Sequence, residues 1–328
     1  MKIPICFATD DKFFKCLCVC VASILKNANV DDEFEFYILN SNCISHENKN
    51  IFTELKKIKN FEVYYIDVDK DVIENLLKKA GITIAPETYF RLFLSSLLPK
   101  HLTKVIYLDG DTIVCESIKD LFMTDLSDYY IAGVEDIGYY DNSICFGRKR
   151  ENFTYVNAGL ILVNLEKFRK ENVELKFISF LNNPGIKLFH HDQDIINFVL
   201  HDKCKILDLR YNVQDTFYNI SKGVRLHPAQ DRIKKALKNP AIIHFSGSSK
   251  PWKFSYSVYA KYWFKYLKYT PYKHNFKISD RIKFSFRKYF FYLKLYFRVI
   301  LSPILIFYRN INFQLVIILL KKYKFKIF

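Results

Sequence analysis

The chain has 328 residues, half of them hydrophobic, which is enough to bury a full core and favours one large domain or two small ones. The net charge of +16 comes from the C-terminal part, because residues 254–328 hold sixteen Lys and Arg against one acid and leave 34 basic and 33 acidic residues elsewhere. Since the first 253 residues are close to neutral, the composition does not indicate a nucleic-acid-binding protein, and we expect no nucleic-acid partner.

The cysteines and the N-terminal residues carry no recognisable zinc or export signal. The eight cysteines lie mostly in apolar runs, and Cys16, Cys18 and Cys20 lack the paired two-residue spacing of a zinc site. We expect them to be reduced thiols buried in the core. Because Lys2 leads directly into a short strand-like run, without the features of a signal peptide, we expect a cytoplasmic protein.

Strand-like apolar runs alternate with amphipathic helical stretches along the chain. Strands are expected at residues 3–8, 34–39, 61–68, 104–108, 130–134, 156–163 and 241–245, and helices at 13–26, 45–58 and 87–98. This alternation predicts an α/β fold in which helices flank a mostly parallel sheet. In such sheets the functional residues lie in the loops just after the strands, and four clusters of polar residues stand out.

The first polar cluster is Asp109-Gly110-Asp111, which directly follows the apolar run 104–108. Alternate residues of an extended chain share a face, so both carboxylates can point at one ion. Oxygen ligands suit a hard cation such as Mn²⁺ or Mg²⁺, which can bridge a diphosphate and offset its charge. The alternative interpretation is a turn with two solvated acids.

The second cluster follows the apolar run 241–245, where His244 is succeeded by a Gly/Ser loop that carries Gly247 and Lys250. His244 can act as a third metal ligand through a ring nitrogen. Lys250 and the backbone N–H groups near Gly247 can contact phosphate oxygens. Taken alone, a histidine in this position is more often a structural residue with satisfied hydrogen bonds.

The third and fourth clusters lie at the starts of helical patterns. Residues 190–197 place Asp192 and Gln193 on one turn, where a carboxylate and an amide can hold sugar hydroxyls. Acidic residues also cap helix N-termini, which is the alternative role for this cluster. Residues 7–12 end a strand-like run, and their backbone donors together with Asp10 can bind a nucleoside.

Taken in order, these clusters resemble those of glycosyltransferase family 8, together with residues 89–92 (Tyr-Phe-Arg-Leu) and 156–160 (Val-Asn-Ala-Gly-Leu). The family includes glycogenin and the retaining galactosyl- and glucosyltransferases of bacterial lipopolysaccharide synthesis. The resemblance covers roughly residues 3–255 and rests on the ordered set rather than on any single motif. It implies a GT-A type fold, a UDP-hexose donor, a glycan or lipid-linked oligosaccharide acceptor, and transfer of galactose or glucose with retention of configuration.

The resemblance assigns the metal and donor sites to particular residues. It implies that Asp109, Asp111 and His244 hold Mn²⁺, or Mg²⁺ in its place. The residues expected to hold the nucleotide-sugar are Ala8, Asp10, Arg91, Asp109, Gly110, Asp111, Asn157, Ala158, Asp192, Gln193, His244, Gly247 and Lys250. Lys12 departs from the family pattern, because the best-known bacterial members carry Asn there, so the nucleobase and ribose contacts near this position stay open.

The candidate catalytic residues are Gln193, Asp194 and Asp192. Gln193 matches the family position that lies near the reacting carbon, and the two aspartates are its neighbours. The family has no agreed catalytic nucleophile, so the resemblance implies none here. It implies instead that the metal ion and Lys250 stabilise charge on the leaving UDP while the acceptor hydroxyl attacks from the same face, with electrostatic stabilisation as the main contribution.

Residues 256–328 are expected to form a basic, aromatic, helical tail outside a catalytic domain of residues 1–255. Residues 284–294 interleave Lys and Arg with Phe, Tyr and Leu, which is typical of an amphipathic segment at an anionic membrane surface. Pro303 interrupts an uncharged stretch, so we expect surface binding rather than a spanning helix. At about 1 kcal/mol per basic residue, the tail predicts peripheral binding to the inner face of the cytoplasmic membrane. The alternative is a helical cap on the core, and we expect the first part, residues 252–267, to pack in this way.

The segment 108–114 (Leu-Asp-Gly-Asp-Thr-Ile-Val) also resembles the nucleophile motif of haloacid-dehalogenase-type phosphatases, in which the first Asp attacks phosphorus and the second donates a proton. That alternative would make Asp109 a nucleophile. However, the motif usually follows the first strand of that fold, and no convincing acidic motif follows downstream. A non-enzymatic membrane- or nucleic-acid-binding module would explain the tail and leave the four ordered clusters unexplained.

Overall fold

The computed structural model describes residues 1–41, 44–79, 85–139, 144–145, 148–149, 154–182, 188–222, 227–253 and 257–275. All of these residues belong to one compact unit, formed by Met1–Lys253 with Ser257–Phe276. Most of the residues expected to bind a membrane, from 276 onward, lie outside this description. Among the described residues, no helix is long and apolar enough to cross a membrane.

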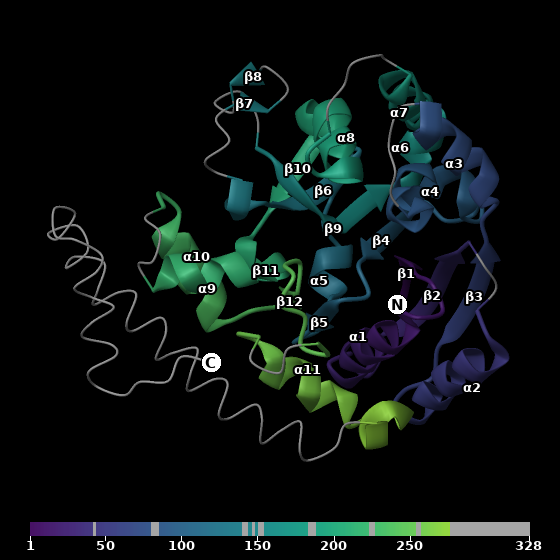
Figure 1. Cartoon of the computed structure of the whole chain (residues 1–328), viewed down its shortest axis with the longest axis vertical. Coiled ribbons are helices and arrows are strands. Elements are labelled where there is room, and N and C mark those ends of the chain that lie inside the picture. The colour runs from purple at the N-terminus through teal and green to yellow at the C-terminus, as the bar shows by residue number, and fades with distance from the viewer. Residues whose placement is uncertain are drawn as a thin grey trace, which may run out of the picture. The chain divides into compact units, whose positions relative to one another are not determined.

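A seven-stranded sheet forms the centre of this unit, with the strand order β10-β6-β9-β4-β1-β2-β3 (Figure 1). The strands are β1 (Lys2–Ala8), β2 (Glu33–Asn40), β3 (Glu62–Asp67), β4 (Lys104–Leu108), β6 (Ile131–Glu135), β9 (Val156–Asn164) and β10 (Cys204–Leu207). Neighbouring strands are parallel except at β9, which runs antiparallel to both β4 and β6. The predicted α/β fold with a mainly parallel sheet is therefore confirmed.

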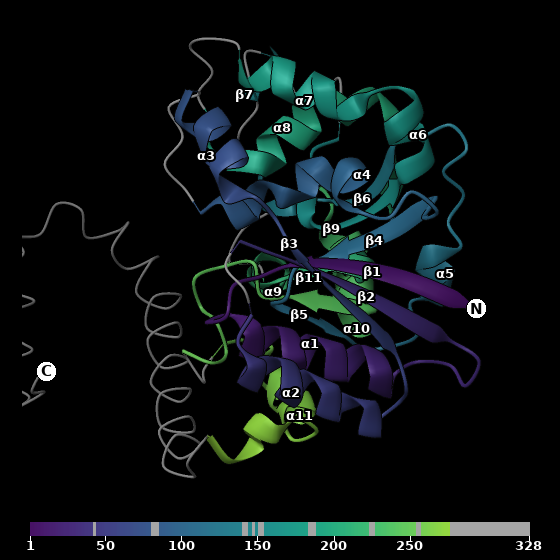
Figure 2. The ribbon, with the colours of Figure 1, turned by 90° about the vertical axis from the view of Figure 1, so that its right-hand side faces the viewer.

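Helices cover both faces of the sheet, as Figure 2 shows. One face carries α1 (Phe14–Lys26), α2 (His46–Glu54) and α11 (Ala260–Leu267). The other carries α3 (Lys70–Lys79), α4 (Leu94–Leu97), α6 (Leu165–Lys170), α7 (Val173–Leu181) and α8 (His191–Leu200). Because both faces are covered, the central strands read as continuous apolar runs rather than as an alternation of apolar and polar residues.

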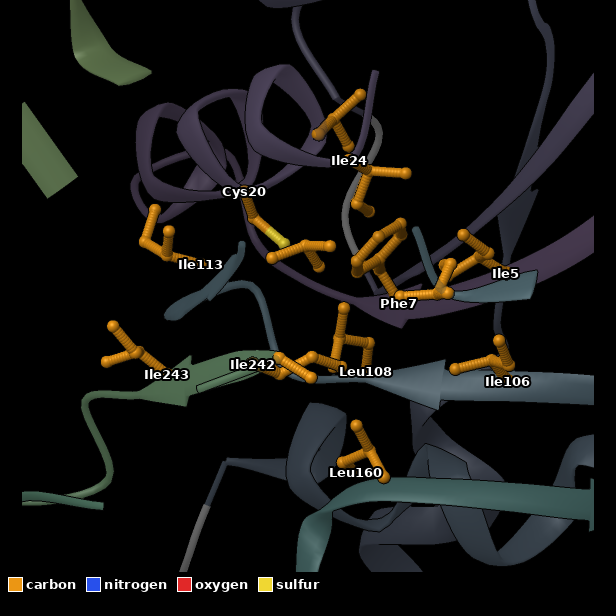
Figure 3. Packing of buried hydrophobic residues seen from close by; sticks show 14 of the residues in the cluster. Ile5, Phe7, Cys20, Ile24, Ile106, Leu108, Ile113, Leu160, Ile242 and Ile243 are labelled. Carbon is orange, nitrogen blue, oxygen red and sulfur yellow. The ribbon is translucent and has the colours of Figure 1, made fainter. Parts of the chain in front are cut away.

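The core packs through side chains that alternate along each strand. Ile5, Phe7 and Leu108 point from the sheet toward Cys20 and Ile24 of α1 (Figure 3). Their neighbours along the same strands join a second cluster under the opposite helices. Each large apolar side chain buried in this way contributes about 1.5–3 kcal/mol. The prediction of buried reduced thiols is confirmed for the three cysteines of α1, which are free and buried.

A second sheet of three strands places the loop after β12 beside the aspartate pair. It consists of β5 (Thr112–Val114), β11 (Val213–Gln214) and β12 (Ile242–His244), with β12 parallel to β11 and antiparallel to β5. Helices α9 (Asp215–Ser221) and α10 (Gln230–Lys238) follow β11 in the chain. The sequence analysis predicted β12 but neither of its partners, because two- and three-residue strands leave no periodic pattern.

Short elements complete the unit. They are α5 (Lys119–Phe122), β7 (Ile144–Cys145), β8 (Arg148–Lys149) and the 3₁₀ turns η1 (Leu55–Lys57), η2 (Pro86–Phe93), η3 (Ile137–Tyr139), η5 (His201–Lys203), η6 (Leu209–Asn212) and η7 (Pro271–Asn275). The helix expected at 87–98 is mostly the 3₁₀ turn η2, and only its last part is α-helical, as α4. The first part of the expected tail packs as predicted, because Trp263 and Tyr266 of α11 are buried in the core.

Candidate functional site

Asp109, Asp111 and His244 meet at the carboxyl end of β4. Asp109 follows β4, Asp111 leads into β5, and His244 ends β12. Because His244 lies opposite Thr112 in the pairing of β12 with β5, its ring is brought beside Asp111. One ligand atom from each of the three residues lies within 4.8 Å of the other two. The fold thus brings together the three residues expected to hold a metal ion.

Two carboxylates and one imidazole share this mostly buried space. His244 Nε2 lies 3.3 Å from Asp111 Oδ1 and 3.8 Å from Asp109 Oδ2. Burial alone would raise the pKa of Asp111, but His244 and Lys250 lower it below its usual value, so the carboxylate stays ionised. Lys250 Nζ donates to Asp111 Oδ2 at 2.5 Å and to the carbonyl of Phe245. A mixed set of oxygen and nitrogen ligands is one that a divalent cation such as Mn²⁺ accepts.

Gly159 of β9 makes this close arrangement possible. The N–H of Asp109 donates to the carbonyl of Gly159 at 2.8 Å, because β9 runs beside β4. A Cβ atom at Gly159 would lie 2.2 Å from His244 Cε1 and 2.8 Å from Asp109 Oδ2. Only a residue without a side chain therefore leaves room for both groups at this point of β9.

Arg91, in η2, joins the aspartate pair to helix α8. Its guanidinium pairs with Asp109 Oδ1 and with Asp192 Oδ2, both at 2.9 Å. It also donates to the carbonyl of Ala158 at 2.6 Å and lies 4.5 Å from the centre of the Tyr107 ring. Burial raises the pKa of Asp192 to about 6, although Arg91 opposes this shift. Arg91 thus fixes the positions of both carboxylates. Loss of any one of the three residues would leave an uncompensated charge in a buried site.

A network of buried polar side chains lies next to the group formed by Asp109, Asp111 and His244. Gln193 Oε1 accepts hydrogen bonds from Asn157 Nδ2 and from the N–H of Ala158, both at 3.0 Å. Gln193 Nε2 and Asn157 Nδ2 also donate to Asp136 Oδ2 at 3.1 Å. The sequence analysis missed Asp136, although it follows the apolar run 130–134 closely, which is the signal that identified the aspartate pair.

Asp194 occupies a different position from its neighbour Gln193. Its carboxylate accepts hydrogen bonds from the Tyr155 hydroxyl at 2.5 Å and from the N–H groups of Phe189 and His190 at 2.6 and 2.8 Å. Asp194 lies in the first turn of α8, where an acidic residue also complements the helix dipole. It stabilises the start of the helix, and it is not among the described residues that line the cavities next to the aspartate pair.

Two adjoining cavities share Thr88, Arg91, Asp109 and Asp111 in their walls. The first has a volume of about 410 Å³ and is also lined by Asn157, Ala158, Asp192, Gln193 and His244. The second has a volume of about 580 Å³ and is also lined by Ala8, Asp10 and Gly110. The residues expected to contact the sugar thus line the first cavity, those expected at the nucleoside line the second, and the carboxylates expected to bind a metal ion lie at their junction.

The second cavity has aromatic and basic walls. Phe13 and Trp252 meet edge to face with ring centres 5.6 Å apart, and both line the cavity together with Lys12. Asp10 accepts a hydrogen bond from the N–H of Phe13 at 2.7 Å, so it also shapes the turn into α1. Trp263 of α11 supports Trp252, with ring centres 5.8 Å apart. The first part of the expected tail therefore supports this wall.

Three consecutive residues after η6 hold buried polar atoms without a partner. Among the described residues, Gln214 Nε2, Asp215 Oδ1 and Thr216 Oγ1 are buried and make no hydrogen bond. Gln214 and Thr216 line the first cavity. A Cβ atom at Gly247 would lie 3.1 Å from Asp215 Oδ2, so the loop after β12 passes close to this carboxylate. The sequence analysis missed all three residues, because no recognisable strand precedes them.

Asp215→Asn is expected to stabilise the protein more at neutral than at acidic pH. Burial raises the pKa of Asp215 to about 6, although His244 and Lys250 oppose this shift. The folded protein therefore keeps this proton at a pH where the unfolded chain has released it, so the contribution of Asp215 to stability falls as the pH rises from about 4 to about 6. The Asn variant avoids this loss of folding free energy, which reaches about 3 kcal/mol at pH values above about 6. Thermal unfolding across this pH range, without added metal, measures the difference, and a pH-independent difference would contradict it.

Comparisons with known proteins agree with this geometry. Residues 4–255 match the family described as glycosyl transferase family 8. General stress protein A of Bacillus subtilis is 29% identical over 269 residues, which cover 80% of this chain and 91% of that protein. The lipopolysaccharide 1,3-galactosyltransferase of Salmonella typhimurium is 25% identical over 281 residues, which cover 83% and 80% of the two proteins. A crystal structure of the galactosyltransferase LgtC with donor and acceptor sugar analogues aligns with a TM-score of 0.68 at 25% identity, over 82% of this chain and 96% of that one.

The family match includes every residue that the sequence assigned to the donor and metal sites. The similarity to LgtC confirms the GT-A type fold. None of these matches supports the phosphatase alternative, in which Asp109 would be a nucleophile. The chain belongs to glycosyltransferase family 8 and is a hexosyltransferase.

Proposed function

We propose that this enzyme transfers galactose or glucose from a UDP-hexose to an acceptor of the lipopolysaccharide or lipooligosaccharide type, with retention of configuration and with Mn²⁺ as cofactor. The observation that carries the proposal is the position of Asp109 and Asp111 at the junction of the two cavities. A donor with its nucleoside in the second cavity and its sugar in the first would have its diphosphate at these carboxylates. The named activities of the Salmonella relative and of LgtC support galactosyl transfer to a glycan.

The residues at the junction fit a divalent cation. Asp109 and Asp111 offer carboxylate oxygens, and His244 offers a ring nitrogen, all within 4.8 Å of one another. A bound Mn²⁺ or Mg²⁺ would supply positive charge against the diphosphate as UDP leaves. Lys250, which lies against Asp111, would add a second positive charge from the protein itself.

The residues of the first cavity would orient the donor sugar. Arg91 fixes Asp192 by an ion pair, so the carboxylate is in place before a sugar hydroxyl arrives. The amide of Gln193 is held by Asn157 and Asp136, which makes it a rigid group near the expected position of the reacting carbon. We assign Gln193 and Asp192 to the substrate and Asp194 to the positioning of the helix start. No residue is assigned as a covalent nucleophile.

The anomeric configuration of the product tests this proposal. The enzyme would be incubated with UDP-galactose, UDP-glucose and UDP-N-acetylhexosamines in the presence of Mn²⁺ and a panel of oligosaccharide acceptors. We expect transfer from one of the two UDP-hexoses and an α-linked product by NMR, because these donors are themselves α-linked. A β-linked product would contradict retention, and transfer only from a UDP-N-acetylhexosamine would contradict the donor assignment.

Truncation after about residue 280 is expected to spare transfer to a soluble acceptor and to weaken binding to anionic vesicles. The described residues of both cavities lie before this point, and so does Trp263, which supports Trp252 in the wall of the second cavity. The removed residues carry most of the basic excess, which we propose docks the cytoplasmic enzyme on the inner face of the membrane. Vesicle sedimentation with anionic and with neutral lipids, beside turnover on a soluble acceptor, measures the two effects. Equal loss of both would show that the tail is not separable from the catalytic part.

A further inference from the structure

Asn212, the last residue of η6, connects the metal-binding residues to the wall of the first cavity. Its side chain is completely buried. Its Nδ2 donates to Asn157 Oδ1 at 2.9 Å, and its Oδ1 lies 3.0 Å from His244 Nδ1. Because Asn157 in turn contacts Gln193, a continuous chain of hydrogen bonds runs from the imidazole to the amide nearest the expected reacting carbon.

The orientation of the Asn157 amide determines which atom donates in each hydrogen bond of this chain. Asp136 Oδ2 lies 3.1 Å from one of the two polar atoms of the Asn157 amide. The N–H of Gly159, which only donates, lies 3.0 Å from the other atom, which is therefore the oxygen Oδ1. The backbone N–H of Gly159 thus determines the orientation of the Asn157 amide, and the amide nitrogen points toward Asp136.

The orientation of Asn157 determines that of Asn212 and the protonation of His244. Asn157 Oδ1 accepts, so Asn212 must present its Nδ2 to it and turn its Oδ1 toward the imidazole. The Asn212 oxygen can only accept, so His244 Nδ1 must carry a proton. The other ring nitrogen, Nε2, faces Asp109 and Asp111 and is the one left to bind a metal ion between them.

We propose that Asn212 is a positioning residue that holds His244 in the tautomer required for metal binding and links the metal site to Gln193. The inference rests on the proposed function, since it takes the Asp109, Asp111 and His244 group to be the metal site. A histidine ligand whose second nitrogen donates to a fixed acceptor is held in one ring orientation and one tautomer. Here the acceptor is an amide rather than a carboxylate, and it is itself tied to the residues that line the sugar cavity.

Nitrogen-15 NMR of histidine-labelled full-length protein tests the tautomer directly. Mg²⁺ replaces Mn²⁺ in this experiment because Mn²⁺ would broaden the signals, and the spectrum of a His244→Gln variant identifies the His244 resonances. We expect the proton on Nδ1 of His244. A proton on Nε2 alone would overturn the proposal without affecting the assignment of the chain as a glycosyltransferase.

Mn²⁺ affinity, measured by electron paramagnetic resonance without any donor, tests the role in metal binding. Asn212→Leu removes both hydrogen bonds, and we expect Mn²⁺ affinity to fall by about 10- to 100-fold. Asn212→Asp keeps an acceptor for Nδ1–H, although it sets a carboxylate oxygen against Asn157 Oδ1 in place of the donor, and we expect it to retain most of the affinity. Asn27→Ala is the matched control, because Asn27 is a bridging amide that bonds Ser23, Val114 and Tyr266 instead.

The outcomes separate the inference from the proposed function. Loss of affinity in Asn212→Leu, retention in Asn212→Asp and no change in Asn27→Ala support the positioning role. Wild-type affinity in Asn212→Leu, or equal loss in the Leu and Asp variants, would overturn it while leaving Mn²⁺-dependent transfer by the wild type intact. If Asn212→Leu does not fold, the comparison of the Asp variant with wild type and the NMR experiment still decide the question. A wild type that binds no Mn²⁺ would contradict both the inference and the metal assignment.

Discussion

Asp109→Asn is expected to lower Mn²⁺-dependent release of UDP from the donor by about 1,000-fold or more, which corresponds to about 4 kcal/mol of transition-state stabilisation. The substitution removes one negative charge from the group formed with Asp111 and His244. It also leaves Arg91 with one carboxylate partner instead of two. Rates of UDP release at increasing Mn²⁺ concentration, together with Mn²⁺ binding by electron paramagnetic resonance, measure both consequences.

Asp125→Asn is the matched control for this substitution. Asp125 is an exposed aspartate whose carboxylate bonds the N–H and hydroxyl of Ser127, and it lines a separate cavity beside Lys104 at the start of β4 rather than at its carboxyl end. We expect it to keep wild-type turnover and wild-type Mn²⁺ binding. If Asp109→Asn kept its rate within about tenfold of wild type at saturating Mn²⁺, Asp109 would not be a metal ligand.

Gly159→Ala is expected to abolish Mn²⁺ binding and to lower turnover by about 100-fold or more, although the added group is a single methyl. The new Cβ would lie 2.2 Å from His244 Cε1 and 2.8 Å from Asp109 Oδ2, so both groups must move. Overpacking of this kind costs typically about 1–3 kcal/mol of stability, and a displacement of about 1 Å costs about 100-fold in rate. Mn²⁺ affinity, turnover and the thermal unfolding midpoint, measured on the same preparation, separate loss of the site from loss of the fold.

Gly133→Ala is the control that separates steric strain from damage to the site. Its Cβ would lie 3.1 Å from Cβ of Val156, so it strains the same sheet at a point where its nearest neighbours do not include Asp109, Asp111 or His244. We expect a lower unfolding midpoint and an unchanged Mn²⁺ affinity. Equal loss of Mn²⁺ affinity in both variants would mean that strain in the sheet, and not the contact with His244 and Asp109, explains the effect.

Local patterns were sufficient to predict the aspartate pair and every strand of the main sheet except the edge strand β10 (Cys204–Leu207). Asp109 and Asp111 are two residues apart after a buried strand, so their joint orientation depends only on the extended backbone between them. The buried strands appear in the sequence as uninterrupted apolar runs, since helices cover both faces of the sheet. The antiparallel direction of β9 has no such signature, because a strand buried on both faces has the same composition in either direction.

Long-range pairing decides the rest of the site, and the sequence pattern does not contain it. Asn212 reaches His244 because β11 pairs with β12, yet β11 is only two residues long and has no detectable period. The contacts of Asp194 are also absent from the sequence pattern, since its carboxylate bonds the Tyr155 hydroxyl and the backbone before α8. Capping was the alternative interpretation of the cluster at residues 190–197, and these contacts support the proposal that Asp194 positions the start of the helix.

The most direct test of the account is UDP release by the wild-type enzyme from UDP-galactose and UDP-glucose, with Mn²⁺ and with a chelator. Slow hydrolysis of the donor is an expected side reaction of such an enzyme, so the measurement needs no known acceptor. We predict release from one of the two donors, dependent on Mn²⁺ and absent with the chelator. Release at the same rate with the chelator, or no release from either donor, would contradict the proposal that Asp109, Asp111 and His244 hold a metal ion at the diphosphate of a UDP-hexose.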